Sequence, residues 1–309
     1  MSSKIDAIIA DLLEKIADMS GTPKGAYNIR KDGKLASRSS SEHIEITSKT
    51  DKSGIDIRIQ PGTKGEQVHI PVVITESGLS EEVYNDFFIG EDCDVDIVAG
   101  CGIHNCGEQR SQHDGIHTFY VGKNSRVRYT EKHYGSGDGN GERVMNPQTV
   151  VYLEEGASIQ LDTAQLRGVD STKRYTKIVV GKDGEAVVTE RLLTHGKQTA
   201  ESEMDVILDG EGATGRIVSR SVAQDDSHQV FYPRMVGENQ CFGHVQCDAI
   251  IMDNAKIKAI PAITCNHTDA QLIHEAAIGR IAGDQILKLM TLGLTSEEAE
   301  ERILNGFLQ

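Results

Sequence analysis

One pattern recurs along most of this 309-residue chain and limits what it can fold into. A turn of glycine, aspartate or asparagine leads into a short strand in which apolar and polar residues alternate. The apolar anchor residues of successive strands are Val95, Val127, Ile159, Val187, Ile217 and Ile257. Their spacing starts at 32 residues and ends with a step of 40. A unit of about 30 residues cannot bury its own apolar face, so each unit must stack on the next.

The repeat predicts a mainly β protein in the form of a stacked solenoid. Alternation with a period of two indicates strands with one buried face. Further strands are expected between the anchors, at Gln148–Leu153, Thr176–Val180, Met204–Leu208 and His244–Met252. Two or three strands per unit, with no helical segment between them, favour a β-helix. A β-sandwich is the alternative, because its turns come roughly every 8–12 residues and short spacings also occur here.

Helical periodicity marks the N-terminal end of the chain. Apolar residues recur at helical spacing from Ile5 to Met19, and Gly21 and Pro23 then end the predicted helix. The segment 20–42 is polar and rich in serine. We therefore expect it to be a linker or a loosely ordered arm.

Helical periodicity returns at the C-terminal end. A mixed apolar run reaches Met290, and Thr295-Ser-Glu-Glu298 forms a capping box in which each end residue satisfies a free backbone N–H of the other. The predicted organisation is an N-terminal helix and arm at 1–42, a β-helix core at 43–276 and a helical region at 277–309.

Composition and short motifs exclude several function classes. The 32 basic and 47 acidic residues give a net charge of −15, which argues against a nucleic-acid groove. No apolar stretch approaches the roughly 18 residues that span a bilayer, and the first residues do not resemble a signal peptide. We therefore expect a cytoplasmic protein without a membrane partner. Gly-x-Ser-x-Gly, His-Glu-x-x-His and Walker motifs are not found in the sequence.

The cysteines and histidines are not evenly spread, and many of them gather in three groups. The first runs from Cys101 to Cys106 and is followed by His113 and His117, the second joins Cys241, His244 and Cys247, and the third joins Cys265 and His267, followed by His274 and Glu275. Thiolate, imidazole and carboxylate together suit iron or zinc. The pair Cys247 and His274 is 27 residues apart, about one repeat, so neighbouring coils could hold both at one place.

The sequence pattern alone also allows a purely structural role, without metal or ligand binding, for these and similar residues. Cys93 is typical of a small, inward-facing apolar residue. Cys101 and Cys106 lie in a glycine-rich turn, where thiols often have no function. The pair His113 and His117 is more typical of a solvated surface than of a metal site. The glycine-rich segment 135–141 is more typical of a flexible turn than of a phosphate cradle.

Several motifs together resemble the SufB/SufD family of iron–sulfur cluster assembly proteins. They occur in the family's order over about residues 80–309, at Val98–Gly102, Gly122–Tyr129, Gln246–Ala255, Ile260–Ile263, Ala270–Gly279, Asp284–Leu287, Leu292–Ala299 and Asn305–Phe307. The resemblance implies a right-handed parallel β-helix with helical ends that dimerises through the β-helix. It also implies a scaffold, not an enzyme, that builds a transient iron–sulfur cluster with a SufC-like ABC ATPase bound to the C-terminal helical region. Sulfur would come from a cysteine desulfurase.

The resemblance also implies site residues. Cys247 falls on the cysteine that SufB-type members use, and Glu275 after His274 falls on their His-Glu pair. The expected cluster and metal ligands are therefore Cys247, His274 and Glu275, with weaker candidates at Cys265, His267, Cys101 and Cys106.

The chain is shorter than typical SufB, and the insertion around 105–113 is unusual. We therefore expect a homodimer with two ATPase subunits, a B2C2 complex, in place of a heterodimer with a SufD-like paralogue. The alternatives are a SufD-like structural partner without a cluster, and a β-helix enzyme acting on carbohydrates.

Overall fold

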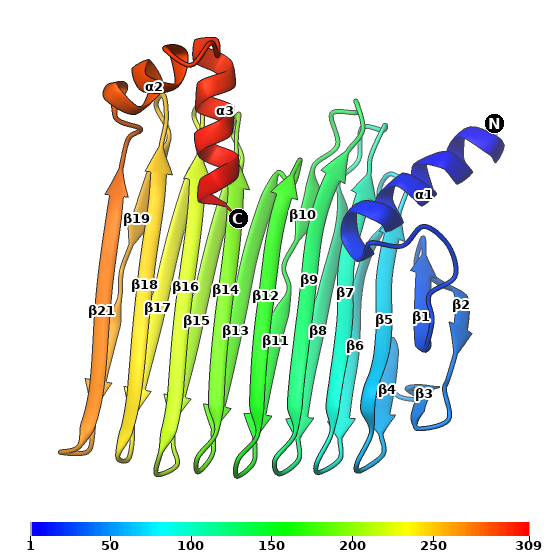
Figure 1. Cartoon of the computed structure of the whole chain (residues 1–309). Helices are drawn as coiled ribbons and strands as arrows, with labels where there is room; N and C mark the ends of the chain where they lie inside the picture. Colours follow the sequence, from blue (N-terminus) through cyan, green and yellow to red (C-terminus); the bar gives the residue numbers. More distant parts are fainter. Residues whose placement is uncertain (1, 309) are drawn as a thin grey trace.

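The computed structural model describes residues 2–308, with side chains from Asp6 to Leu308. In this range the chain forms a flattened solenoid of two facing sheets, with one helix near its start and two at its end (Figure 1). Strands pair in parallel except at the N-terminal edge, where β1–β2 and β3–β4 are antiparallel. The predicted parallel β-helix is confirmed, and the sandwich alternative is wrong. Met1 and Gln309, at the ends of the predicted divisions, lie outside the described residues.

The elements are distributed between the sheets as follows. The first sheet contains β1 (Ala26–Lys31), β2 (Lys34–Ser39), β5 (Lys64–Ile74), β7 (Asp94–His104), β9 (Arg126–Ser136), β12 (Ser158–Arg167), β14 (Glu185–Thr194), β16 (Ala213–Ala223), β18 (Cys241–Ile251) and β21 (Ala270–Gly279). The second sheet contains β3 (Ile44–Ser48), β4 (Gly54–Ile59), β6 (Ser80–Ile89), β8 (Ser111–Val121), β10 (Arg143–Met145), β11 (Gln148–Leu153), β13 (Ser171–Val180), β15 (Thr199–Leu208), β17 (His228–Gly237), β19 (Lys256–Ala259) and β20 (Ala262–Cys265). The helices are α1 (Ser2–Ala17), α2 (Gly283–Met290) and α3 (Ser296–Phe307).

The recurring turns owe their composition to backbone geometry. Asp92, Asn124 and Asp183 have left-handed φ angles of 55°, 56° and 53°, and Gly156 and Gly212 take the same role at 68° and 74°. These are the residue types that tolerate this region. Each of these turns precedes a strand of the first sheet, so the turn residue and the alternating strand together define one coil.

The coil length changes along the solenoid. Three predicted anchors are in register, namely Val95, Val127 and Ile159, which are 32 residues apart. Ile159 then pairs with Ala186, so Val187 lies one position out of register. Ile257 belongs to β19 in the second sheet, whereas the other anchors lie in the first sheet. This explains why the last interval between anchors, from Ile217 to Ile257, is 40 residues long. Two adjacent valines at 187 and 188 left the pattern ambiguous there.

Apolar side chains from both sheets form one continuous core. Phe87 stacks on Phe119 with ring centroids 4.3 Å apart, and Tyr129 meets Phe119 edge-on. Cys93 is 1% exposed in this core, which confirms its predicted role as an inward-facing apolar residue.

The N-terminal arm is more ordered than the sequence indicated. Residues 26–39 form the β1–β2 hairpin, and β1 pairs in parallel with β5. Ala26 and Asn28 are buried at this edge of the sheet. The prediction of a linker is wrong for this part, because β2 is an edge strand whose residues are mostly exposed and therefore show no alternation.

Helix α1 lies across β5, β7 and β9 of the first sheet (Figure 1). Leu12 and Ile16 of this helix are fully buried against the sheet. Glycines on β7 allow this approach, because a Cβ at Gly100 would stand 2.5 Å from the Ile16 carbonyl oxygen. The predicted N-terminal helix is thus confirmed and lies against the solenoid.

The C-terminal helical pair is confirmed, including its capping box. Thr295 Oγ1 accepts from the Glu298 N–H, and Glu298 Oε2 accepts from the Thr295 N–H. Several apolar residues of this region remain exposed, with Leu287 at 60% and Leu292 at 76%. Among the described helices, none combines the length and apolar character that crossing a membrane requires.

Candidate functional site

Two predicted ligands meet on the last coil of the first sheet. Cys247 lies on β18 and His274 on the neighbouring terminal strand β21, and both point into the solenoid. Cys247 Sγ is 3.6 Å from His274 Nε2, across the 27-residue spacing noted in the sequence. Cys247 is 4% exposed, whereas His274 is partly open to solvent because no further coil covers β21 in the described chain. A buried thiol therefore lies next to an accessible imidazole.

Glu275 does not lie inside the solenoid with Cys247 and His274. Successive side chains of a strand point to opposite faces, so Glu275 lies on the outer face of β21. Its side chain is 64% exposed, and its Oε2 atom lies 3.6 Å from His244 Nε2 on β18. The three predicted ligands are thereby divided: Cys247 and His274 form an inner pair, whereas Glu275 lies outside beside His244, which was not a predicted ligand.

The inner pair is held in its neutral form. Burial, followed by the negative charges of Glu190 and Asp248, raises the pKa of Cys247 from 9.0 to about 12. Burial and the neighbouring His244 lower the pKa of His274. At neutral pH the pair is therefore a thiol facing an unprotonated imidazole, and the imidazole can accept the proton that a metal must displace.

This electrostatic setting gives a pH-dependent prediction. Because the folded chain raises the pKa of Cys247, the neutral thiol contributes its full stability below pH 9 and loses it as the pH rises toward 12.

Replacing Glu190 with glutamine removes a negative charge, so the pKa of Cys247 should fall. Alkylation of Cys247 at pH 9 should then accelerate by up to about tenfold, because a larger fraction of the thiol is ionised. Peptide mass spectrometry after timed iodoacetamide treatment measures the rate.

Glu185→Gln is the matched control for that measurement, since Glu185 is an exposed residue of the same strand, β14. It should leave the Cys247 rate unchanged. An equal acceleration in both variants would show that general loosening, and not the charge of Glu190, governs the thiol.

A file of buried polar side chains runs along the interior from the N-terminal coils toward Cys247. Its members are Glu81, His113, His117, Glu131, His133, Arg174, Glu190, Ser202 and Ser219. Arg174 Nη1 is 2.5 Å from Glu131 Oε2, and its Nε is 3.7 Å from Glu190 Oε1. Ser219 donates to Glu190 Oε2 at 3.2 Å, and Ser219 pairs directly with Cys247 across strands β16 and β18.

Charge pairing compensates for burial in this interior. Burial alone would raise the pKa of Glu131, but Arg174 and His133 hold it well below its usual range. The same balance, with His113 and Arg30 as partners, lowers the pKa of Glu81 to about 2.

Two of the histidines contradict their expected exposure. Burial lowers the pKa of His117 to about 4, and His117 and His113 are 5% and 6% exposed. The prediction that they are solvated is therefore wrong. Both occupy inward positions of β8, because Gly115 between them leaves room for their rings, which lie within 3.4 Å of where its Cβ would be.

The weaker candidates are scattered. Cys101 is buried and faces the interior, where burial and then Glu81 raise its pKa, whereas Cys106 is exposed on the following loop. Cys265 is exposed on β20 of the second sheet, and His267 Nδ1 accepts the Asp269 N–H at 3.1 Å. Within residues 2–308, no three cysteine, histidine or acidic side chains are placed to hold a metal ion.

Sequence reasoning missed the charged members of the interior. Glu131, Arg174 and Glu190 are at most 7% exposed. The available signal was their position, since each occupies an inward place in an alternating strand. A charge at such a place requires a buried partner.

The fold and the inner pair define a β-helix protein with a thiol–imidazole site at its terminal coil. Residues 84–307 match a family model described as "SUF system FeS cluster assembly, SufBD core domain". The chain belongs to this SufBD family of iron–sulfur cluster assembly proteins.

Archaeal relatives carry the same family name. The chain is 28% identical over 281 residues to an "Iron-sulfur cluster assembly SufBD family protein" of Archaeoglobus fulgidus, covering 89% of this chain and 73% of that protein. The corresponding protein of Methanocaldococcus jannaschii is 27% identical over 92% of this chain and 90% of its own length. One from Methanothermobacter thermautotrophicus is 28% identical, and the chain spans 62% of it.

Proposed function

We propose that this chain is a scaffold on which an iron–sulfur cluster is built and from which the cluster is passed to other proteins. Family membership supports a role in assembly. The observation that carries the scaffold role is the 3.6 Å approach of Cys247 Sγ to His274 Nε2 on the last coil. Thiolate and imidazole are both ligands for iron in clusters.

The geometry suits a cargo that must leave again. Cys247 and His274 supply two ligands, so the remaining iron positions are left to exchangeable groups or to a second chain. Iron binding would displace the thiol proton, and the unprotonated His274 beside it is the acceptor. Glu275, on the outer face with His244, is proposed as an auxiliary ligand during entry or exit.

A second copy of the chain is the proposed cover for the last coil. The outer edge of β21 is unpaired in the described chain, and Ile273 and Ile278 are 46% and 41% exposed on it. Such an edge invites pairing with another strand. A homodimer joined here would bring two Cys247 sites together. A SufD-like paralogue is the alternative partner, and the thiol at position 247 favours a SufB-like role for this chain.

The C-terminal helices are the proposed docking site for a SufC-like ABC ATPase. A groove of about 690 Å³ lies along α3 between Leu294, Glu298, Arg302 and Leu308. Leu287 and Leu292 add exposed apolar surface beside it. ATP hydrolysis is assigned to that partner, a cysteine desulfurase supplies the sulfur, and the chain itself acts as a cytoplasmic scaffold and not as an enzyme.

Anaerobic reconstitution with iron and inorganic sulfide tests the scaffold role. Wild type is expected to gain a cluster that is visible by absorption and Mössbauer spectroscopy, and Cys247→Ser is expected to lose it. Cys241→Ser is the matched control, since Cys241 is also a buried thiol on β18. Equal loading of wild type and Cys247→Ser would move the cluster to another site. No loading of either would favour a SufD-like structural partner.

A further inference from the structure

Two cysteines that the proposed function does not use approach each other at the terminal coil. Cys241 begins β18 in the first sheet and is buried, whereas Cys265 ends β20 in the second sheet and is exposed. Both thiols are free. Cys247 lies six residues further along β18, which is about 20 Å at the usual rise per residue, so the two cysteines are separate from the inner pair.

The place of the Cys241 sulfur follows from the lack of a side chain at Gly237. A Cβ at Gly237 would stand 2.8 Å from Cys241 Sγ, and its other near neighbours would be Ala270 and Leu272 of the last coil. One coil earlier, the register partner of Gly237 is Leu208, a buried core residue. The sulfur of Cys241 therefore lies in the interior space that a larger side chain at position 237 would fill.

Cys265 occupies the next position along the same interior row. Gly237 and Cys265 are register partners in the parallel pair of β17 and β20, so their side-chain positions face the same, interior side of the second sheet. Neighbouring strands lie about 4.8 Å apart, which sets the approximate separation between the Cys265 position and the space that holds the Cys241 sulfur. Burial raises the pKa of Cys241, and the Cys265 thiol acts in the same direction, as proximity of the two groups requires.

The strand that carries Cys265 is weakly held. A disulfide needs the two sulfur atoms about 2.0 Å apart, which corresponds to an inward shift of roughly 3 Å. β20 has four residues, all exposed, and in the described chain it pairs with β17 on one side and has an open edge on the other. A segment with so few buried contacts moves at a low cost in free energy. The fold thus places a thiol on a movable strand beside a thiol in the core.

We propose that Cys241 and Cys265 are a redox-active dithiol, which a low-molecular-weight disulfide R–S–S–R converts into an intramolecular disulfide. Cys265 reacts first because it is exposed. Its thiolate attacks R–S–S–R, the donor S–S bond breaks, and Cys265–S–S–R forms as R–S⁻ leaves. The Cys241 thiolate then attacks the Cys265 sulfur and expels the second R–S⁻. The leaving groups take up the two protons that the cysteines release, so one protein disulfide and two R–S–H are formed.

The disulfide would restrain the last coil. It would join β18 of the first sheet to β20 of the second, at the start of the turn that leads into β21. Because β21 carries His274, opening of the candidate site would then depend on the redox state of the surrounding thiols. The dithiol itself does not require that the chain build a cluster.

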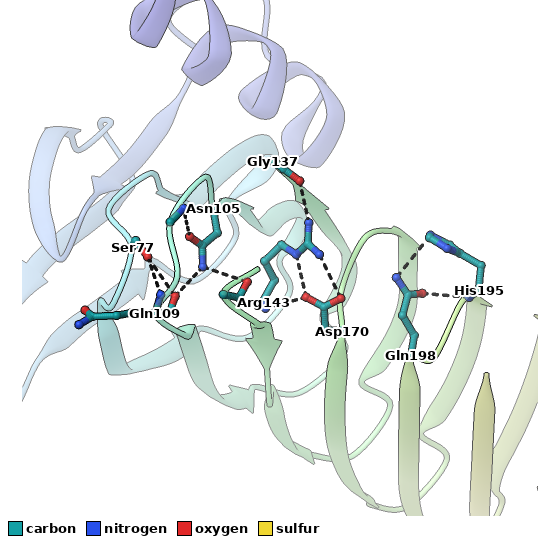
Figure 2. A network of polar contacts seen from close by, with 10 residues as sticks. Ser77, Asn105, Gln109, Gly137, Arg143, Asp170, His195 and Gln198 are labelled. Atoms are coloured by element: carbon teal, nitrogen blue, oxygen red, sulfur yellow. Dashed lines mark hydrogen bonds and ion pairs between the residues drawn. The ribbon is translucent and has the colours of Figure 1, made fainter. Parts of the chain in front are cut away.

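Cys106 is the control thiol, because it is exposed while Cys101, the nearest cysteine in sequence, is buried in the interior. The loop of Cys106 is fixed by Asn105, which is fully buried and whose Nδ2 donates to carbonyl oxygens of Gln109 and of the glycine-rich segment 135–141 (Figure 2). That segment, expected as a flexible turn, is therefore part of a packed layer. We expect Cys106 to form a mixed disulfide that no second thiol resolves.

Oxidised glutathione is the probe for the first test, applied to the full chain without iron. Digestion without reductant and mass spectrometry identify the products. Wild type is expected to give a peptide joined through Cys241 and Cys265, with glutathione retained on Cys106. In Cys241→Ser, Cys265 should also retain glutathione. Retention of glutathione on Cys265 in wild type, or a disulfide between the Cys265 residues of two chains, would overturn the proposal.

Hydrogen–deuterium exchange measures the restraint on the last coil. In oxidised wild type, amide exchange in peptides that cover β20 and β21 should slow, and dithiothreitol should restore it. Cys265→Ser, treated in the same way, should show no change. Unchanged exchange in the cross-linked protein would overturn the link to the candidate site. Neither experiment uses iron or sulfide, so failure of cluster reconstitution would count against the scaffold role alone.

Discussion

Replacing Arg174 with methionine is expected to lower the free energy of unfolding by about 3–5 kcal/mol. Arg174 is 7% exposed and lies between two buried carboxylates, with its guanidinium 2.5 Å from Glu131 and 3.7 Å from Glu190. Methionine fills similar space but leaves both carboxylates without their cation. Because the chain has no tryptophan, urea unfolding followed by circular dichroism is the suitable measurement.

The control for Arg174→Met is Arg128→Met. Arg128 also bridges two carboxylates, those of Asp94 and Asp96, but its side chain is 40% exposed. Its loss should cost less than about 1 kcal/mol. Similar losses in the two variants would show that burial does not set the value of the interior pair.

The pH dependence gives this prediction a second readout. In the wild type, Arg174 helps to hold the pKa of Glu131 low, so this carboxylate contributes stability at neutral pH and loses it in acid. In Arg174→Met, burial dominates and raises the pKa of Glu131. Protonation of Glu131 then removes its unpaired buried charge from the variant. The difference in unfolding free energy between the variant and wild type should therefore shrink as the pH falls toward 5.

Replacing His274 with alanine is expected to lower cluster retention at least about tenfold, since even residues that only support a ligand contribute 10–100-fold. His274 Nε2 lies 3.6 Å from Cys247 Sγ, and the residue is partly open to solvent, from where iron would enter. The measurement is iron and sulfide retained per chain after anaerobic desalting of the reconstituted protein.

The neighbouring residue supplies the comparison. Glu275→Gln removes a carboxylate from the outer face of the same strand, next to His244 and away from the thiol. We expect it to retain most of the cluster and to change mainly the rate of its loading or release. A larger loss in Glu275→Gln than in His274→Ala would place the cluster on the outer face.

The architecture could be predicted because its signals are local. Turn residues with left-handed φ and strands that alternate with a period of two mark each first-sheet strand from β7 to β16. The β1–β2 hairpin carried no such signal, because β2 is an edge strand exposed along most of its length. The slip at Val187 arose where two adjacent valines satisfy the alternation equally well.

The site was predictable only in part, for a geometric reason. A spacing of one coil brings residues together along the axis, and this was sufficient to pair Cys247 with His274. Which face a residue occupies depends on the parity of its position, and parity separates His274 from Glu275. The contacts of Arg174 join residues 41 and 43 positions apart, and no simple coil count predicts them.

The polar file bears on how this solenoid unfolds. In most repeat proteins each unit is coupled only to its neighbours, so partial unfolding from either end requires little free energy. Here one guanidinium joins β9, β13 and β14, and the Glu81 carboxylate joins β1, β6 and β8. Loss of any of these strands would expose unpaired charge in the others, so the middle of the molecule should behave as a single cooperative block. The coil that bears Cys247 and His274 lies beyond that block, so we expect it to open locally while the rest remains intact, which would suit the proposed scaffold role.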